Sequence, residues 1–260
     1  MRVITLTTDF GSRDWFVGTM KGVIARLVPE ANVIDITHEV APGDVRGGAF
    51  ALAAAVPYFP EGTIHVAVVD PGVGSHRRAI ALRTNDAFFL GPDNGVLSWA
   101  VRDAQLEDVR EISNDDWFLQ PVSRTFHGRD VFAPVAARLA GGAAFSAVGE
   151  SISDFLRISW PAIVHDGQRI TGEVVYVDRF GNAITNVPAE ALPLEAAAKG
   201  AVRLRCAGID VCLRAYYAAA NPNEVLAVAS SSGLLELAIN GGSFAQRYFV
   251  KEGAIVEAVW

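Results

Sequence analysis

Cysteine and lysine are both scarce in this chain, and each scarcity narrows what the protein can be. The two cysteines, Cys206 and Cys212, lack histidine or cysteine neighbours at zinc-ligand spacing, so the sequence predicts no zinc site. They could face each other across a hairpin, but two isolated cysteines more often stay reduced. Only Lys21 and Lys199 precede the C-terminal tail, and the net charge is −7. Because a chain without a basic run suits a phosphate backbone poorly, we expect no nucleic-acid partner.

Long apolar runs are also missing. The longest, residues 49–56, stops at Pro57 and is far shorter than the roughly 18 residues of a membrane helix. The N-terminus opens directly into a strand-like run, without the basic and apolar regions of a signal peptide. We therefore expect a soluble, cytoplasmic protein that does not enter a membrane.

The first part of the chain, residues 1–155, alternates strand-like and helix-like patterns. Apolar residues make up 51% of the 260 positions, which is enough for a large core. We predict strands at 3–6, 33–36 and 64–69, helices at 16–27, 45–56 and 129–139, and a short hairpin at one sheet edge from 79–82 and 88–90. Such alternation predicts an N-terminal α/β domain with a mostly parallel central sheet.

The pattern changes after about residue 150. Residues 156–169 are predicted to be a linker, and residues 170–260 a second domain. Seven short β-rich runs separated by turn residues lie in this part, at 169–177, 183–187, 201–206, 211–216, 225–229, 234–239 and 255–259. Their spacing predicts a small antiparallel sandwich or barrel.

The most informative segment is residues 68–78 (VVDPGVGSHRR). An apolar strand ends there in Asp70, and a loop with two glycines leads to Arg77 and Arg78. A carboxylate at the C-terminal end of a buried parallel strand lies where open α/β sheets bind ligands. The glycines allow a tight path that could fold an arginine back towards Asp70. The alternative is an Asp-Pro-Gly turn with solvated arginines.

A second polar segment, residues 125–130 (TFHGRD), places His127 just before a predicted helix. Taken alone, such a histidine is more often structural than catalytic. Its value comes from its combination with Asp70 and the two arginines, since these residue types together can orient and polarise a small nucleophile.

Asp9 follows the first strand and opens a glycine-containing loop before the first helix. A carboxylate at this position could accept hydrogen bonds from both hydroxyls of a ribose. Asp9 or Asp14 could instead cap the helix. The loop lacks both Gly-x-Gly-x-x-Gly and a P-loop lysine, so it is no dinucleotide or nucleoside-triphosphate fingerprint.

Two segments of the second domain carry polar residues at turns and inside a strand. Residues 178–182 (DRFGN) form a predicted turn, in which Asx residues are ordinary turn formers. Residues 230–242 contain Glu236 inside an apolar run, where a buried carboxylate needs a hydrogen-bond partner. The alternative is a glutamate that faces solvent on a barrel strand.

Together, six segments resemble the S-adenosyl-L-methionine (SAM) hydroxide adenosyltransferase family. In chain order they are TDFGSRD (8–14), VDPGVG (69–74), RR (77–78), FHGRD (126–130), DRFGN (178–182) and SSGLLELAIN (231–240). The family is similar in fold to the SAM-dependent fluorinase and chlorinase. The resemblance implies an N-terminal α/β domain, a C-terminal antiparallel β-barrel and a homotrimer. Each active site would lie between the N-terminal domain of one subunit and the C-terminal domain of its neighbour.

The chemistry that the resemblance implies is attack of water or hydroxide on C5′ of SAM, giving adenosine and L-methionine. SAM is then the substrate, and no cofactor or metal is expected. Asp70, Arg77 and His127 match the family's catalytic residues, with Arg78 a less favoured choice for the arginine. Because methionine leaves a sulfonium readily, the enzyme mainly needs a water in line with the C5′–S bond. Asp70 and His127 would hold and polarise it, while Arg77 would lower the cost of hydroxide character.

The substrate-binding residues that the resemblance implies are Asp9, Asp178, Asn182, Ser231 and Glu236. Asp9 would hold the ribose diol, and Glu236 would pair with the methionine ammonium. Asn182 would reach the methionine or ribose end, and Asp178 would lie near the amino-acid end. The aromatic candidates for packing against adenine are Phe180, Tyr216 and Tyr217.

Two other functions fit part of this pattern. The fluorinase has tyrosines at the positions of Asp70 and His127 and a serine at that of Gly128, whereas the chlorinase also has glycine there. A chlorinase-like halogenase thus stays an alternative, although a carboxylate at Asp70 would repel a halide in a tight apolar pocket. A non-catalytic SAM or adenosine sensor would not need Asp70, Arg77 and His127 together, so their joint presence favours the enzyme.

Overall fold

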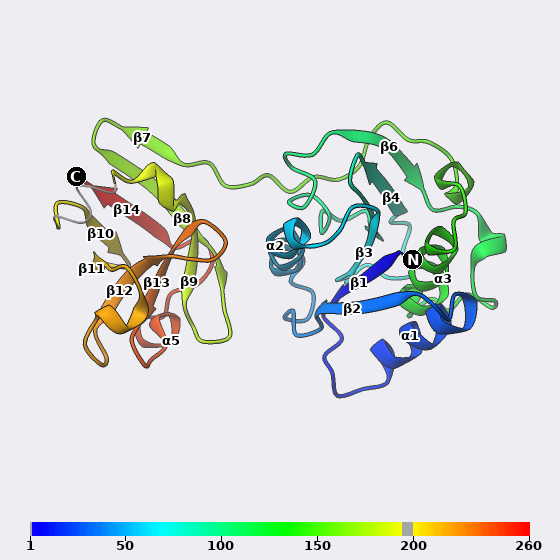
Figure 1. The fold of residues 1–260 in the computed structure, drawn as a ribbon, viewed down its shortest axis with the longest axis horizontal. Coiled ribbons are helices and arrows are strands. Elements are labelled where there is room, and N and C mark those ends of the chain that lie inside the picture. The colour runs from blue at the N-terminus through cyan, green and yellow to red at the C-terminus, as the bar shows by residue number, and fades with distance from the viewer. Residues whose placement is uncertain (1, 194–199) are drawn as a thin grey trace. The chain divides into compact units, whose positions relative to one another are not determined.

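A computed structural model describes residues 2–193 and 200–260, which form two compact units (Figure 1). The first unit spans residues 1–159 and the second spans residues 160–260. Within the predicted linker, the Leu156 N–H donates to Asp93 Oδ1 at 2.7 Å and the Ile158 carbonyl accepts from Trp99 Nε1 at 3.1 Å. These bonds attach residues 156–158 to the first unit. No helix among the described residues combines the length and the apolar character that a membrane crossing requires.

A six-stranded sheet forms the centre of the first unit, in the order β2-β1-β3-β5-β4-β6. Its strands are β1 (Val3–Thr8), β2 (Asn32–Thr37), β3 (Thr63–Val68), β4 (Ala79–Thr84), β5 (Ala87–Pro92) and β6 (Leu106–Glu111). Strands β2, β1, β3 and β5 run parallel, and β4 is antiparallel to both of its neighbours. The predicted α/β domain with a mostly parallel sheet is therefore confirmed.

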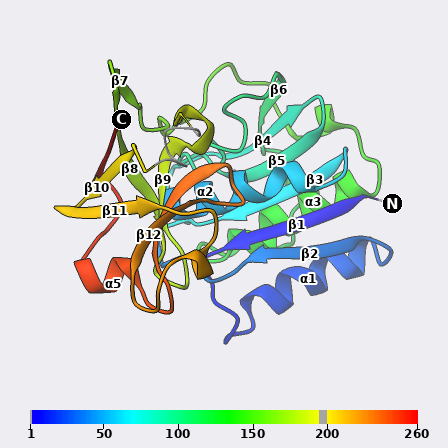
Figure 2. The same cartoon turned by 60° about the vertical axis from the view of Figure 1, so that its left-hand side comes forward.

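Helices cover both faces of this sheet because its central strands are apolar on both sides (Figure 2). The helices are α1 (Phe16–Leu27), α2 (Val45–Ala55) and α3 (Ala133–Ala140). Ile64 and Val66 of β3 pack with α1 and α3, whereas Ala67 packs in the layer that contains Leu52 of α2. This alternation follows from the two-residue period of a strand. Short 3₁₀ turns occur at Val56–Tyr58, Asp115–Trp117 and Phe145–Val148.

The hairpin of β4 and β5 does not lie at the sheet edge, so that prediction is wrong. Strand β6 (Leu106–Glu111) pairs with β4 and forms the edge instead. Four of the six residues in its sequence, LEDVRE, are charged, and it carries no strong strand pattern. Charged residues suit an edge strand because they discourage pairing with another chain. For the same reason, the strand lacks the apolar pattern from which strands are predicted.

The helix predicted at 129–139 is in two parts. A π-helical turn at Gly128–Phe132 leads into α3, and Pro134 lies in the first turn of α3. Proline has no N–H to donate to the carbonyl four residues earlier. That carbonyl, of Asp130, accepts instead from the backbone N–H of Leu119 at 2.9 Å. The turn directly follows His127 and therefore sets the position of that residue.

The second unit is built around a closed seven-stranded barrel. Its strands and short helix are β7 (Val164–Asp166), β8 (Arg169–Val177), β9 (Ala183–Pro188), β10 (Arg203–Cys206), β11 (Ile209–Leu213), β12 (Val225–Ala229), β13 (Leu234–Ile239), α5 (Phe244–Tyr248) and β14 (Ile255–Val259). The order is β14-β10-β11-β12-β13-β9-β8, and the β14–β8 pairing closes the ring. Strand β7 pairs with β8 outside the ring, and 3₁₀ turns occur at Ala189–Ala191 and Tyr217–Ala219.

The predicted antiparallel barrel is confirmed, with one parallel pairing between β11 and β12. Its interior contains apolar side chains from all seven strands of the ring. In the β10–β11 register Cys206 is opposite Ile209, so it does not face Cys212, and both thiols are free. Burial raises the pKa of the Cys206 thiol to about 11, so this thiol stays protonated at neutral pH.

Candidate active site

Asp9 and Asp70 both lie at the C-terminal ends of strands in the first sheet. Strands β1 and β3 are adjacent and parallel, and Thr8 is opposite Val68 in their register. The two aspartates therefore follow neighbouring strand ends. Open α/β sheets bind ligands at the carboxyl ends of their strands.

Asp70 forms a bidentate ion pair with Arg77. Arg77 Nε donates to Asp70 Oδ1 at 3.0 Å, and Arg77 Nη2 donates to Oδ2 over a shorter distance. The two side chains are only 4% and 11% exposed, so the interpretation of Arg77 as a solvated arginine is wrong. Gly74 permits the close approach of the loops, because its φ is +75° and a Cβ there would overlap the Arg124 carbonyl oxygen.

Arg77 also contacts His127, and this contact defines the state of the imidazole. Arg77 Nη2 lies 2.8 Å from His127 Nδ1. A guanidinium can only donate, so Nδ1 is the acceptor and the neutral ring carries its proton on Nε2. Burial lowers the pKa of His127, and the positive charge of Arg77 lowers it further. His127 is therefore neutral at pH 7 and offers one N–H donor.

The loop that carries His127 is anchored by a buried carboxylate. Asp130 is 0% exposed, and its Oδ1 accepts from Arg129 Nε at 2.6 Å. Its Oδ2 accepts from Arg129 Nη2 at 2.9 Å and from the Ser123 backbone N–H at 2.8 Å. These bonds connect both ends of the 123–130 loop, so Asp130 holds the backbone on which His127 stands.

A small cavity lies beside Asp70 and His127. Its lining residues are Phe10, Val68, Asp70, Val73, Thr125, Phe126, His127 and Gly128. Its volume is about 40 Å³, and one water takes up about 30 Å³ in the liquid. A Cβ on Gly128 would lie 3.1 Å from Met20 Sδ and 3.3 Å from the Phe126 ring. The site thus has room for one small nucleophile against two polar groups.

Arg78, the alternative catalytic arginine, points to other partners. Its Nε and Nη2 donate to Asp93 Oδ2 at 2.9 and 2.6 Å, and its Nη1 donates to Asp154 Oδ1 at 3.1 Å. These bonds hold the 154–158 segment against the first unit. Of the two neighbouring arginines, only Arg77 contacts Asp70 and His127.

Asp9 is half-buried beside the same sheet edge. Its Oδ2 accepts from the Gly43 backbone N–H at 2.8 Å. Helix α1 begins after Trp15 and has no side-chain cap, so the helix-cap interpretation of Asp9 and Asp14 is wrong. The other Asp9 oxygen has no hydrogen bond to a described residue in the first unit, which is compatible with the predicted ribose contact.

In the second unit, Asp178 and Asn182 form one tight turn between β8 and β9. Asp178 Oδ1 accepts from the N–H groups of Phe180 and Asn182 at 2.9 and 2.8 Å, and Oδ2 accepts from Asn182 Nδ2 at 3.0 Å. Two backbone N–H groups and one of the two Nδ2–H groups of Asn182 are thus satisfied within the turn. The carbonyl oxygen of the Asn182 side chain has no such role in the turn and can accept a hydrogen bond from a ligand.

Glu236 is buried in β13 and hydrogen-bonded to a tyrosine. It is 4% exposed, so the interpretation as a solvent-facing glutamate is wrong, and its Oε1 accepts from Tyr217 Oη at 2.6 Å. Burial raises the pKa of Glu236, the Tyr217 hydroxyl lowers it, and the nearby charge of Asp178 raises it. Burial and the Glu236 carboxylate raise the pKa of Tyr217. Glu236, Tyr217 and Asp178 therefore form one electrostatically coupled group.

The other residues predicted in the second unit are at its surface. Ser231 is exposed in the turn between β12 and β13. Phe180 is 75% exposed and Tyr216 is 63% exposed, whereas Tyr217 holds Glu236 through its hydroxyl. Packing of Phe180 or Tyr216 against adenine stays a prediction.

The sequence alone did not predict the structural roles of Asp130 and of the Tyr217 hydroxyl. Asp130 stood in the FHGRD motif without a role, although an acid in an apolar helix needs a partner. For Tyr217, the sequence predicts only packing of its ring against adenine. Within the described residues, no group of three or more His, Cys, Asp or Glu side chains could hold a metal ion. The expectation that no cofactor is needed stays a prediction.

Known proteins match this chain over nearly its whole length. Residues 4–149 match the SAM hydroxide adenosyltransferase N-terminal domain, and residues 172–257 match the C-terminal domain. An (R)-S-adenosyl-L-methionine hydrolase from Salinispora tropica is 46% identical, covering 96% of this chain and 95% of that protein. A crystal structure of an uncharacterized conserved protein from Thermotoga maritima has a TM-score of 0.91 at 38% identity and covers 99% of this chain and 100% of that one.

A fluorinase from Actinoplanes sp. is more distant, at 27% identity, covering 98% of this chain and 96% of that protein. Both domain matches and the identity to the hydrolase agree with the six motifs and with the two-unit architecture. The chain belongs to the SAM hydroxide adenosyltransferase family.

Proposed function

We propose that this protein hydrolyses SAM by attack of water on C5′, releasing adenosine and L-methionine. The observation that carries the proposal is the contact of Arg77 with both Asp70 and His127 beside a cavity of about 40 Å³. The similarity to (R)-S-adenosyl-L-methionine hydrolases supports the same reaction.

Each of the three polar residues has a distinct task in this proposal. The Asp70 oxygens accept from Arg77 but keep further lone pairs, so Asp70 accepts a hydrogen bond from the attacking water. Neutral His127 donates Nε2–H to the water oxygen and fixes its direction. Arg77 offsets the negative charge that builds up as the water loses its proton.

The reaction forms the C5′–O bond and breaks the C5′–S bond, and the bonding electron pair goes to sulfur. The product methionine has a neutral thioether, and the proton from water passes through Asp70 to solvent. Because the leaving group is already good, most of the acceleration comes from the position of the water rather than from a strong base.

The residues of the second unit bind the amino-acid end of SAM in this proposal. The buried Glu236 carboxylate pairs with the ammonium, Asn182 accepts or donates a hydrogen bond with its amide, and Asp178 shapes the turn that carries Asn182. Ser231 adds a hydroxyl, and Asp9 of the first unit holds the ribose.

A halogenase is a weaker candidate for two reasons. The Asp70 carboxylate lines the cavity and would repel a halide more strongly there than in water. A serine at Gly128 would also meet Met20 and Phe126 at close range, so this cavity does not accommodate the fluorinase residue without adjustment. A sensor would gain nothing from holding His127 in one tautomer.

Product analysis tests the proposal directly. Purified protein is incubated with SAM in oxygen-18 water, with and without chloride, and the adenosyl product is identified by mass spectrometry. We expect adenosine labelled at the 5′ oxygen, unlabelled methionine and no effect of chloride. The main product 5′-chloro-5′-deoxyadenosine would refute the hydrolase, and no turnover under any condition would favour the sensor.

The variants Asp70→Ala and His127→Ala should lower turnover about 10²-fold or more, the usual scale for a positioned acid–base group, with SAM binding largely kept. The matched control is His76→Gln, since His76 is an exposed histidine on the same loop as Arg77. Asp9→Ala should instead weaken binding of SAM and of adenosine alike, because both contain the ribose. Near-normal rates in both Asp70 and His127 variants would mean that these residues are structural.

We also propose that the protein works as a homotrimer in which neighbouring subunits share each active site. The proposal rests on the resemblance and on the placement of the predicted residues in two separate units. Mixing an Asp70→Ala subunit with a Glu236→Ala subunit should restore activity, because some interfaces then combine two intact halves. The control is a subunit with both changes, which should rescue neither partner. A fully active monomer, or no rescue after proven subunit exchange, would refute the shared site.

A further inference from the structure

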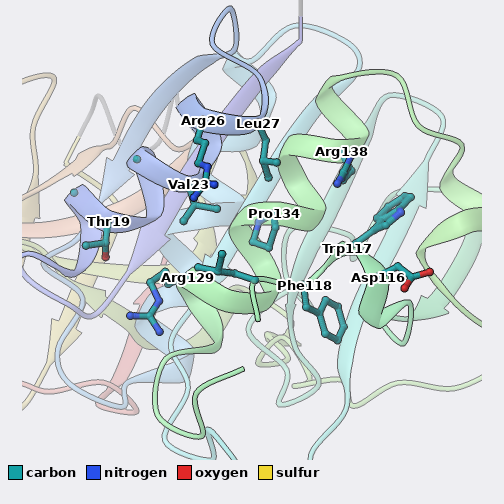
Figure 3. A pocket seen from close by; sticks show the side chains of 13 residues that line it. Thr19, Val23, Arg26, Leu27, Asp116, Trp117, Phe118, Arg129, Pro134 and Arg138 are labelled. Atoms are coloured by element: carbon teal, nitrogen blue, oxygen red, sulfur yellow. The ribbon is translucent and has the colours of Figure 1, made fainter. Parts of the chain in front are cut away.

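A second and larger pocket lies on the first unit, between α1, α3 and residues 116–119 (Figure 3). We call it the α1/α3 groove, and its volume is about 650 Å³. Small-molecule sites typically have about 300–1,000 Å³. Apolar side chains from three segments line it, including Val23 and Leu27 of α1, Pro134 of α3, and Trp117. None of the triad residues Asp70, Arg77 and His127 lines it, so the groove is distinct from the small cavity beside them.

Two glycines of α1 keep the groove open. Gly18 and Gly22 are one turn apart, and a Cβ on either would meet no atom within 4 Å. Nothing in the packing of the first unit therefore requires glycine there. A glycine inside a helix costs about 0.5–1 kcal/mol relative to alanine. The helix thus keeps two unfavourable residues where a side chain would only fill the groove.

The charge at the groove is positive, although the chain carries a net charge of −7. Arg26 and Arg138 line the groove from two different helices, and neither forms an ion pair with a described carboxylate. Arg129 also lines it but is paired with Asp130, and Asp116 is the one acid in the lining. Arginines near helix C-termini stabilise the helix dipole by about 0.3–1 kcal/mol. That effect does not explain why both border one apolar pocket.

We propose that the α1/α3 groove binds a small amphipathic anion, an apolar ring system that carries a carboxylate, sulfonate or phosphate group. The acidic group lies between Arg26 and Arg138, where a guanidinium can form two parallel hydrogen bonds with it. The ring system packs over Gly22 against Val23 and Pro134. This ligand is not the substrate SAM, which is a cation at sulfur and whose proposed site lies elsewhere.

The groove can be tested with the fluorescent anion 8-anilinonaphthalene-1-sulfonate and the full-length protein. We expect saturable binding of one probe per chain that weakens as salt increases. The uncharged ring compound 1-anilinonaphthalene should bind at least 10-fold more weakly. Excess adenosine should not displace the probe, and displacement would place the probe in the substrate site and overturn the proposal.

Two variants and one matched control locate the binding. Gly22→Leu fills the groove while improving helix propensity, so it should fold normally and weaken probe binding at least 10-fold. Arg26→Gln combined with Arg138→Gln should have a similar effect and remove most of the salt dependence. Ala25→Leu adds the same side chain to an exposed position of α1 outside the groove and should leave binding unchanged.

Four further results would overturn the proposal. Binding that survives Gly22→Leu, or equal loss in Gly22→Leu and Ala25→Leu, would mean that the probe sits elsewhere. No saturable binding to the wild-type protein would mean that the groove takes no such anion. A change of oligomeric state in Gly22→Leu, measured by light scattering, would mean that another copy of the chain occupies the groove.

Discussion

Replacing Arg77 by methionine should strongly destabilise the protein, because it leaves the Asp70 carboxylate buried without its partner. Asp70 is only 4% exposed at its side chain, and both of its oxygens accept from Arg77. Removing one partner of a buried ion pair typically costs about 3–5 kcal/mol. Since about 1 kcal/mol moves the melting temperature of a domain of this size by about 2–4 °C, the expected loss is roughly 6–20 °C.

The assay is a double-mutant cycle with Asp70→Asn, Arg77→Met and the double variant, followed by thermal and urea unfolding. The double variant should lose less stability than the two single losses added together, with a coupling of at least about 1.5 kcal/mol for a close charge pair. Turnover should fall in all three variants, because each removes part of the proposed site. A loss below about 1 kcal/mol in Arg77→Met, or additivity within about 0.5 kcal/mol, would refute the buried pair.

Three further predictions concern protonation. His127 should show the ¹⁵N signature of a neutral Nε2–H imidazole at pH 7, and an imidazolium signal at that pH would contradict the geometry. Activity should be constant at pH values above the lowered pKa of His127 and should fall below it. Because the charge of Arg77 lowers this pKa, Arg77→Met should move the acidic limb of the pH–activity profile to higher pH. Tyr217→Phe removes the hydrogen bond that lowers the pKa of Glu236, so the acidic limb of the kcat/KM profile should move to higher pH while kcat changes little. An unmoved limb would show that Glu236 does not control substrate binding through its protonation. Burial lowers the pKa of His65 to about 4 in the folded protein. As the pH falls from 6.5, His65 therefore takes up a proton in the unfolded chain before it does so in the folded protein. The free energy of unfolding should then fall by up to about 3 kcal/mol between pH 6.5 and 4. His65→Phe should remove this dependence in urea titrations, and an unchanged slope would show that other groups cause it.

Local sequence patterns predicted most elements of the fold. The helical spacing of 16–27 and the apolar run of 64–69 depend on residues close in the chain, and both elements formed as predicted. The seven β-rich runs of the second unit also correspond to strands, since turn residues separate them. Strand β6 was missed because it lies at an edge, where charged residues are an advantage and the apolar signal is weak.

The candidate site depended on contacts that no local pattern contains. Both Arg77 and Arg78 were compatible with the loop sequence, and the paths of the 70–77 and 123–130 loops decided between them. The two loops can approach this closely because residue 74 is a glycine, where a Cβ would overlap the Arg124 carbonyl oxygen. Likewise, Glu236 inside an apolar run predicted the need for a partner, but only the tertiary structure identified Tyr217 as that partner.

The sequence by itself therefore determined the family, the α/β and barrel architecture and the set of polar residues, because motifs and periodicities are written in neighbouring positions. The tertiary structure alone decided the protonation state of His127, since that state follows from a 2.8 Å contact with a residue 50 positions away. It also decided that the α1/α3 groove stays open, because the space beside Gly18 and Gly22 depends on how α1 and α3 pack. Hydrogen bonds and cavities arise from distances in space, and these are set only when the whole chain has folded.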